Sequence, residues 1–176
     1  MSATTAFEPR EPHVFAARGA EALVGDQAVA DLVAAASESP NRRARLLLHR
    51  SPDDSLHEMV IALPATSCDR PHINFRSGKS FHVVRGAMAV ILFSDDGRER
   101  YAVRLDAARG GAPFMIRLNV PRWHTIVPFT DPVVFVETIA GPFTGNRFAD
   151  WAPTDMDSAE GRSFAETLRT LANGAR

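Results

Sequence analysis

The chain has 176 residues and a formal net charge of -1 at pH 7; 45% of its residues are hydrophobic and 23% are charged. These values are typical of a soluble globular domain and exclude a disordered chain. The near-neutral charge argues against nucleic acid as a partner. No segment approaches the ~20 consecutive apolar residues that span a bilayer, so we expect a cytoplasmic protein without a membrane partner. Cys68 is the single cysteine, which excludes an internal disulfide and a thiolate-rich zinc site.

Residues 1–44 are predicted to form an N-terminal arm and a short helix. The first twenty residues contain prolines and no clear hydrophobic periodicity, which indicates irregular structure. Apolar residues then recur at helical spacing over residues 25–36, with Asp26 as a candidate N-cap and Pro40 beyond the end. One short helix is therefore expected before the main body of the fold.

Residues 45–142 are predicted to form a β-barrel. Short apolar or alternating runs such as SFHVVRG, AMAVILF and PVVFVETIAG follow one another here, and clusters rich in Gly, Pro, Asn and Asp separate them. Closely spaced strands favour an all-β sandwich or barrel, because a parallel α/β fold would need helices between them. The strongest hairpin signal is SDDG between AMAVILF and YAVRL.

Residues 143–176 are predicted to wrap the barrel and then to form an amphipathic helix. The first part is too rich in Pro, Gly and Asp for a regular element. Phe164, Leu168 and Leu171 then share one helical face, with Ser158 near the start of the helix.

Three polar residues have the spacing from which a small barrel can project side chains toward one point. In residues 71–86, PHINFRSGKSFHVVRG, His72 and Asn74 are two apart and would face the same side of a strand. His124, far from both in the sequence, is the third candidate. Imidazole binds transition metals well, whereas the amide oxygen of Asn74 is a harder and weaker donor. His72, Asn74 and His124 are the candidate metal ligands.

Several sequence blocks within residues 46–155 occur in a distinctive order and spacing. They are HRSPDDSLHEMVIALP, SFHVVRGAMAVILFSDDGR, PRWHT, VFVETIAGPF and FADWAPTD. In this order they resemble the cupins, and within the cupins the WbuC family of small cupin-fold metalloproteins, found with bacterial surface-polysaccharide genes. The resemblance implies a mainly β protein with a single double-stranded β-helix, or jelly-roll, barrel between two helices. It also implies a small-molecule-processing protein in surface-polysaccharide or specialised-metabolite biosynthesis.

The metal ligands that this resemblance implies are only partly present. The family's first motif supplies His-x-His and a Glu seven residues before a glycine, and its second motif supplies another histidine. The matching positions here are His72, Asn74, Lys79 and His124, so two of the expected ligands are replaced. The Pro-x-Gly turn of the second motif is also replaced, by residues 119–121.

Lys79 argues most strongly against a metal ion. An ammonium repels a divalent cation and has no lone pair to donate unless it is deprotonated. We therefore expect a divalent transition metal, whether Fe, Zn, Mn or Ni, to be less favoured than a metal-free pocket. An outward-facing Lys79 would instead leave a weakened site of His72, Asn74 and His124 with water ligands.

Two functional hypotheses follow from this altered set. In the first, the protein is an enzyme in which His72, Lys79 and His124 are catalytic, because a histidine near a cation titrates in the physiological range. In the second, the pocket is a metal-free, non-catalytic module for a small anion, such as an acidic sugar or a carboxylate. The residues leave this choice open. Candidate ligand-binding residues are Arg76, Arg117 and Trp123, the last of which also fits a core position.

Three other histidines are not expected to be ligands. His82 is three residues after Lys79, so strand alternation predicts that the two side chains face opposite sides. His49 and His57 flank the RSPDD turn outside the expected pocket. An open sandwich also leaves strand edges that need cover, so we expect that barrel edges can pair into a homodimer.

Overall fold

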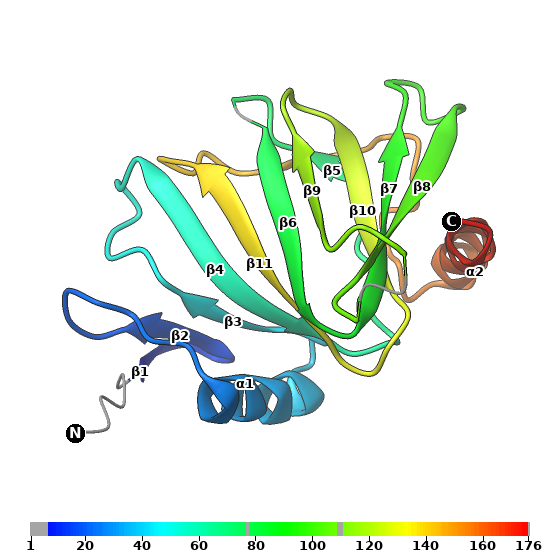
Figure 1. Cartoon of the computed structure of the whole chain (residues 1–176). Coiled ribbons are helices and arrows are strands. Elements are labelled where there is room, and N and C mark those ends of the chain that lie inside the picture. The colour runs from blue at the N-terminus through cyan, green and yellow to red at the C-terminus, as the bar shows by residue number, and fades with distance from the viewer. Residues whose placement is uncertain (1–6, 77, 109–110, 176) are drawn as a thin grey trace.

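The computed structural model describes residues 7–76, 78–108 and 111–175. Over these residues the chain forms two β-sheets and two helices (Figure 1). None of the described helices has the length and apolar character needed to cross a membrane. In chain order the elements are β1 (Phe7–Glu11), β2 (Val14–Ala17), α1 (Asp26–Glu38), β3 (Ala44–Leu47), β4 (Leu56–Leu63), β5 (His72–Ile73), β6 (Lys79–Arg85), β7 (Ala87–Phe93), β8 (Arg100–Asp106), β9 (Met115–Leu118), β10 (Trp123–Pro128), β11 (Val133–Ala140), β12 (Arg147–Phe148) and α2 (Ala159–Asn173).

The two sheets face each other and bring together strands that are distant in sequence. The seven-stranded sheet has the order β1-β2-β3-β4-β11-β6-β9, and the five-stranded sheet has the order β12-β5-β10-β7-β8. Strand β11 pairs antiparallel with both β4 and β6, and β10 pairs with both β5 and β7. Such long-range antiparallel pairing is typical of a jelly roll. The prediction of a mainly β jelly-roll with a helix on either side of it in sequence is confirmed.

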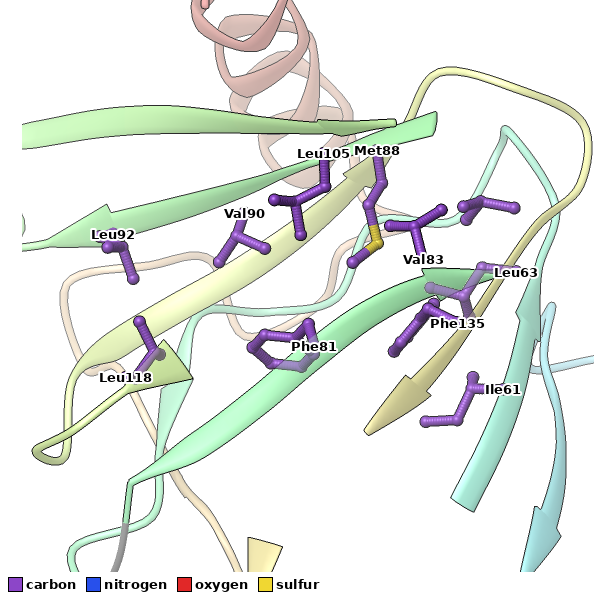
Figure 2. Packing of buried hydrophobic residues seen from close by; sticks show 11 residues of the cluster. Ile61, Leu63, Phe81, Val83, Met88, Val90, Leu92, Leu105, Leu118 and Phe135 are labelled. Atoms are coloured by element: carbon purple, nitrogen blue, oxygen red, sulfur yellow. The ribbon is translucent and has the colours of Figure 1, made fainter. Parts of the chain in front are cut away.

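One apolar cluster fills much of the space between the sheets, as Figure 2 shows. Phe81 and Phe135 project from one sheet and Met88 and Val90 from the other. Full burial of a side chain of this kind contributes roughly 1.5–3 kcal/mol. The remaining buried members are Ile61, Leu63, Val83, Leu92, Leu105, Leu118 and Val133.

Each helix covers the outer face of one sheet. Leu32 and Ala36 of α1 pack on the seven-stranded sheet, where they meet the residues of β3 and β4 that point away from the barrel interior. Leu168 and Ala172 of α2 pack on the five-stranded sheet. The side chain of Ser158 caps α2 by accepting a hydrogen bond from the Gly161 backbone N–H at 3.0 Å, as predicted for the start of this helix.

The N-terminal arm differs from the prediction. Residues 1–6 lie outside the described residues, but residues 7–17 form the β1–β2 hairpin rather than irregular structure. Strand β2 pairs parallel with β3, with Phe15 opposite Leu46. The hairpin is therefore held by long-range pairing to the sheet edge, which local hydrophobic periodicity does not report.

Candidate functional site

A cavity of about 230 Å³ lies between the two sheets. Part of its wall is apolar, with Phe81 and Phe135 from the seven-stranded sheet and Ile126 from the other. The rest is polar and charged, which is unusual for the interior of a small barrel. Its polar and charged lining residues are Arg43, Arg45, Asp69, Arg70, His72, His124, Glu137 and Asn146.

His72 and His124 lie opposite each other on the neighbouring strands β5 and β10. Their ring centroids are 4.5 Å apart. Nδ1 of His72 is 3.1 Å from the Arg70 carbonyl oxygen, and Nδ1 of His124 is 2.8 Å from the Arg122 carbonyl oxygen. A carbonyl oxygen only accepts, so each Nδ1 carries the proton and donates it. In the neutral ring, Nε2 is then left with a free lone pair.

Both imidazoles are held in the neutral form. Burial lowers the pKa of His72, and the positive charge of Lys79 lowers it further. Burial likewise places the pKa of His124 well below its ordinary value, with Lys79 and His72 adding to the effect. At neutral pH the pair therefore offers lone pairs rather than positive charge.

Lys79 is buried beside the histidines. Only 4% of the residue is exposed, and its Nζ atom donates a hydrogen bond to Oε1 of Glu137 at 2.7 Å. Lys79 shares a narrow crevice with His124 and Asn74. In the β6–β9 register Lys79 lies opposite Leu118, which belongs to the apolar cluster between the sheets. Lys79 thus faces the interior, and the outward-facing alternative does not describe this fold.

Asn74 directs its amide oxygen toward its own loop. The residue follows β5 and is buried, and its Oδ1 accepts a hydrogen bond from the Arg76 backbone N–H at 3.0 Å. This contact is an Asx turn, which stabilises the start of the β5–β6 connection. The oxygen expected as a metal ligand is therefore engaged in the backbone of the turn.

This arrangement does not fit a divalent metal ion. His72 and His124 each offer one lone pair, but the charge of Lys79 acts on both rings. The nearby carboxylate, Glu137, is already paired with that ammonium. Within residues 7–76, 78–108 and 111–175, no group of three or more His, Cys, Asp or Glu side chains is arranged to hold a metal.

The three candidate ligand-binding residues do not reach the cavity. Arg76 is exposed in the loop after β5, and Arg117 is exposed on β9. Trp123 lies on the outer face of the five-stranded sheet, because strand alternation turns it away from the side that His124 faces. There its ring packs 6.1 Å from the ring of Trp151. Trp123 belongs to the core beneath α2.

Arg45 is the cavity residue that sequence patterns least suggested. On β3 it alternates with Ala44 and Leu46, which are buried against α1, so its side chain faces the barrel interior. Burial lowers the pKa of Arg45, and the charge of Arg43 lowers it further. Within the described part of the chain its guanidinium has no hydrogen-bond or ion-pair partner. The sequence signal that could have indicated this residue is an arginine between two apolar residues of a short strand, Ala44 and Leu46.

Three neighbouring polar groups complete the wall. The Nη2 atom of Arg43 pairs with Asp69, but its Nε is buried without an acceptor among the described residues. Nε and Nη2 of Arg70 both donate to the Ala149 carbonyl oxygen, at 3.1 and 2.6 Å. The Oδ1 atom of Asn146 is also buried without a donor in the described chain.

The segment that carries Asn146 also holds the first histidine in place. Strand β12 pairs with β5, with Phe148 opposite His72, and the two rings have centroids 6.0 Å apart. The Ala149 N–H donates to the Pro71 carbonyl oxygen at 2.8 Å. Residues 146–149 thus contribute Asn146 and Phe148 to the cavity wall and supply the outer partner of β5.

Comparisons with known proteins agree with this fold. Residues 24–105 match a family model described as a domain of unknown function, DUF6016. Oxalate oxidase in complex with the substrate analogue glycolate is 14% identical, with a TM-score of 0.50 over 78% of this chain and 74% of that chain. The capsular polysaccharide assembling protein CapF from Staphylococcus aureus is also 14% identical, with a TM-score of 0.53. That match covers 62% of this chain and 32% of CapF.

No curated protein matches the sequence. At 14% identity the solved structures are informative about the fold alone, and both of these neighbours are cupins. The sheet order, the sandwich of β-sheets and these two likenesses lead to one conclusion: the chain has the jelly-roll fold of the cupins.

Proposed function

We propose that the barrel cavity binds a small ligand with a carboxylate group, such as an acidic sugar, without a metal ion. The observation that carries the proposal is the Arg45 guanidinium, which lines the cavity without a partner among the described residues. Arg45 is partly buried, and a guanidinium that loses part of its hydration gains from new acceptors. A carboxylate supplies two oxygens that match the planar fork of arginine.

The charges around the cavity support an anionic ligand. Two of the nearby cations are paired, one with Asp69 and one with Glu137. Arg45 and Arg70 have no carboxylate partner among the described residues, and the only acceptor of Arg70 is a neutral carbonyl oxygen. Because the two histidines are neutral, the wall carries excess positive charge that one carboxylate would offset.

Residues at the expected ligand positions support the metal-free form of the proposal. The ammonium of Lys79 stands where the cupin motif expects a carboxylate, and Glu137 neutralises it. Within this pair the ammonium of Lys79 is the charge that lowers the pKa of both imidazoles, and it disfavours a divalent cation beside them. The site is best interpreted as one in which an internal ion pair replaces a metal.

A second candidate function is acid–base catalysis on the same bound anion. It is favoured by the backbone hydrogen bonds of His72 and His124, which fix the proton on Nδ1 and leave Nε2 able to accept one. A neutral imidazole of this kind can remove a proton from a ligand hydroxyl. A place in surface-polysaccharide biosynthesis would agree with the WbuC resemblance and with the description of CapF as a capsular polysaccharide assembling protein.

The decisive experiment combines metal analysis with ligand binding. Protein purified without a metal-affinity column is incubated with Fe(II), Zn, Mn or Ni, desalted and analysed by mass spectrometry. We expect no near-stoichiometric metal. Gluconate should raise the melting temperature, whereas sorbitol, its neutral counterpart, should not.

Two variants locate the effect. Arg45→Gln should abolish stabilisation by gluconate, and Arg50→Gln, which changes an exposed arginine outside the cavity, should leave it intact. Near-stoichiometric metal that is lost in both His72→Ala and His124→Ala would refute the metal-free proposal. Equal stabilisation by gluconate and sorbitol would refute the carboxylate. Turnover that is lost in His124→Gln with gluconate binding retained would identify the catalytic alternative.

A further inference from the structure

A groove of about 730 Å³ adjoins the cavity and is much richer in arginine than the chain as a whole. Arg43, Arg45, Asp69 and Arg70 line both spaces. The other walls come from the turn between β1 and β2, the connection between α1 and β3, residues 66–68, residues 156–157 and α2. The four shared lining residues place the two spaces next to each other.

Two arginines of the groove converge on one neutral oxygen. Arg42 Nη1 and Arg169 Nη2 both donate to the Thr66 carbonyl oxygen, at 3.3 and 3.4 Å. Their carboxylate partners are distant and mostly exposed, at 3.6 Å for Asp157 and 3.8 Å for Glu166. Two guanidinium groups that share one carbonyl repel each other, and these exposed carboxylates offset the repulsion only in part, so a further anion between the two groups would be favourable.

The wall of the groove has an excess of positive charge although the chain has a net charge of -1. Six arginines line it, against three carboxylates. Guanidinium groups arranged around one space are well suited to a phosphoryl group, which offers several acceptor oxygens in a compact dianion. The arginines are Arg42, Arg43, Arg45, Arg70, Arg162 and Arg169, and the carboxylates are Glu11, Asp69 and Asp157.

Two buried polar atoms without a hydrogen-bond partner among the described residues indicate which further groups the ligand carries. Nε of Arg43 is a buried donor without an acceptor in the described chain, and Arg43 lies where cavity and groove meet. Oδ1 of Asn146 is a buried acceptor without a donor there, and it lines the cavity. Buried polar groups of this kind are normally satisfied by a partner. A ligand with acceptor oxygens at the junction and a hydroxyl in the cavity would satisfy both.

We propose that the groove binds a phosphoryl group and that the ligand is a phosphorylated, hydroxylated acid. Its carboxylate would lie in the cavity at Arg45 and its phosphoryl group between Arg42 and Arg169. The inference rests on the proposed function for the carboxylate end and is independent of it for the phosphoryl end. A small ligand is favoured over nucleic acid because the cavity of about 230 Å³ is far too small for a duplex.

Calorimetric titration of the full chain with three probes tests the inference. The probes are gluconate, inorganic phosphate and 6-phosphogluconate, which joins both groups in one molecule. Linking two bound groups raises affinity through effective concentration, so 6-phosphogluconate should bind at least 100-fold more tightly than gluconate. The double variant Arg42→Gln/Arg169→Gln should weaken phosphate and 6-phosphogluconate at least tenfold and leave gluconate unchanged.

A matched control has the same change in charge at a remote place. Arg98→Gln/Arg100→Gln alters two exposed residues around the start of β8, outside the groove and the cavity. This variant should bind all three probes as the wild type does. An equal loss in both double variants would overturn the inference, because a general charge effect would then explain the binding.

Other outcomes separate the two proposals. If gluconate binds but 6-phosphogluconate binds no more tightly, the groove proposal fails and the cavity proposal stands. If phosphate binds through Arg42 and Arg169 but gluconate does not bind, the cavity proposal fails and with it the single ligand that spans both spaces. Competition of duplex DNA with 6-phosphogluconate, lost in the Arg42→Gln/Arg169→Gln variant, would overturn the small-molecule assignment.

Discussion

The Nζ atom of Lys79 lies 2.7 Å from Oε1 of Glu137 in the interior of the barrel. The side chains are 5% and 16% exposed, so water contributes little to the hydration of either charge. In such a pair each charge offsets the desolvation of the other. The stability of the site therefore depends on both residues being present.

The first prediction concerns removal of one charge. Lys79→Met should lower the free energy of unfolding by about 3–5 kcal/mol, because it leaves the Glu137 carboxylate buried without its partner. The double variant Lys79→Met/Glu137→Leu should recover most of that loss. Chemical denaturation of the two single variants and the double variant measures the coupling. A double variant no more stable than Lys79→Met would contradict this account.

The second prediction is a gain of metal binding. Lys79→Glu replaces the ammonium with a carboxylate beside His72 and His124, which gives three ligands of the type that Zn, Mn and Ni accept. We expect near-stoichiometric metal after incubation and desalting, together with a higher melting temperature. Lys79→Gln, which removes the charge without adding a carboxylate, is the control and should bind little. Equal metal uptake by wild type and Lys79→Glu would show that Lys79 is not what disfavours the ion.

The third prediction is a dependence of stability on pH. The folded protein lowers the pKa of His72 and of His124 below the ordinary value of 6.5. Below that pH the unfolded chain binds more protons than the folded one, so stability is full above about pH 6.5 and falls on acidification. Each fully titrating histidine contributes up to about 1.4 kcal/mol per pH unit.

Denaturation between pH 5 and 8 measures this slope. His124→Gln should reduce it, because one of the groups that take up protons on unfolding is removed. Val84→Thr, a change at an exposed position on β6 that removes no titratable group, should leave the slope unchanged. Identical slopes in wild type and His124→Gln would rule out a neutral buried His124.

The fourth prediction concerns the contact between the β7–β8 hairpin and the wrapping segment. Gly97 has a φ of 71°, and a Cβ there would lie 2.4 Å from Cδ2 of Trp151. Gly111 has a similar φ of 92° but open space around it. Both Gly→Ala changes strain the backbone, whereas Gly97→Ala also overpacks the Trp151 ring. Gly97→Ala should therefore be less stable than Gly111→Ala by about 1–3 kcal/mol in denaturation experiments; equal losses would show that the ring moves freely.

Strand alternation and turn residues were sufficient to predict the barrel and part of its site. The alternation of β6 correctly separates Lys79 and Phe81, which face the interior, from His82, which is exposed. His72 and His124 are also brought together, because β5 and β10 pair at these residues. These features follow from local patterns combined with motif order.

Long-range partners were beyond the same patterns. Glu137 is 58 positions from Lys79 in the sequence, and nothing near either residue indicates the pair. Arg45 was missed because β3 lies between α1 and the barrel interior. Strand alternation alone does not say which face of β3 contacts the helix and which faces the cavity. Arg76 and Arg117 were expected to line the pocket as cations, but both are exposed and lie outside the cavity lining.

The pairing of β12 with β5 makes access to the cavity and the placement of His72 mutually dependent. Strand β5 has two residues, and its outer partner is the wrapping segment that also forms a wall of the cavity. If residues 146–149 opened locally, the cavity would gain an entrance in the same event that releases one side of β5. Ligand exchange through that wall and alignment of the two imidazoles would then depend on the same local opening. A bound ligand that contacts Asn146 would stabilise the closed form.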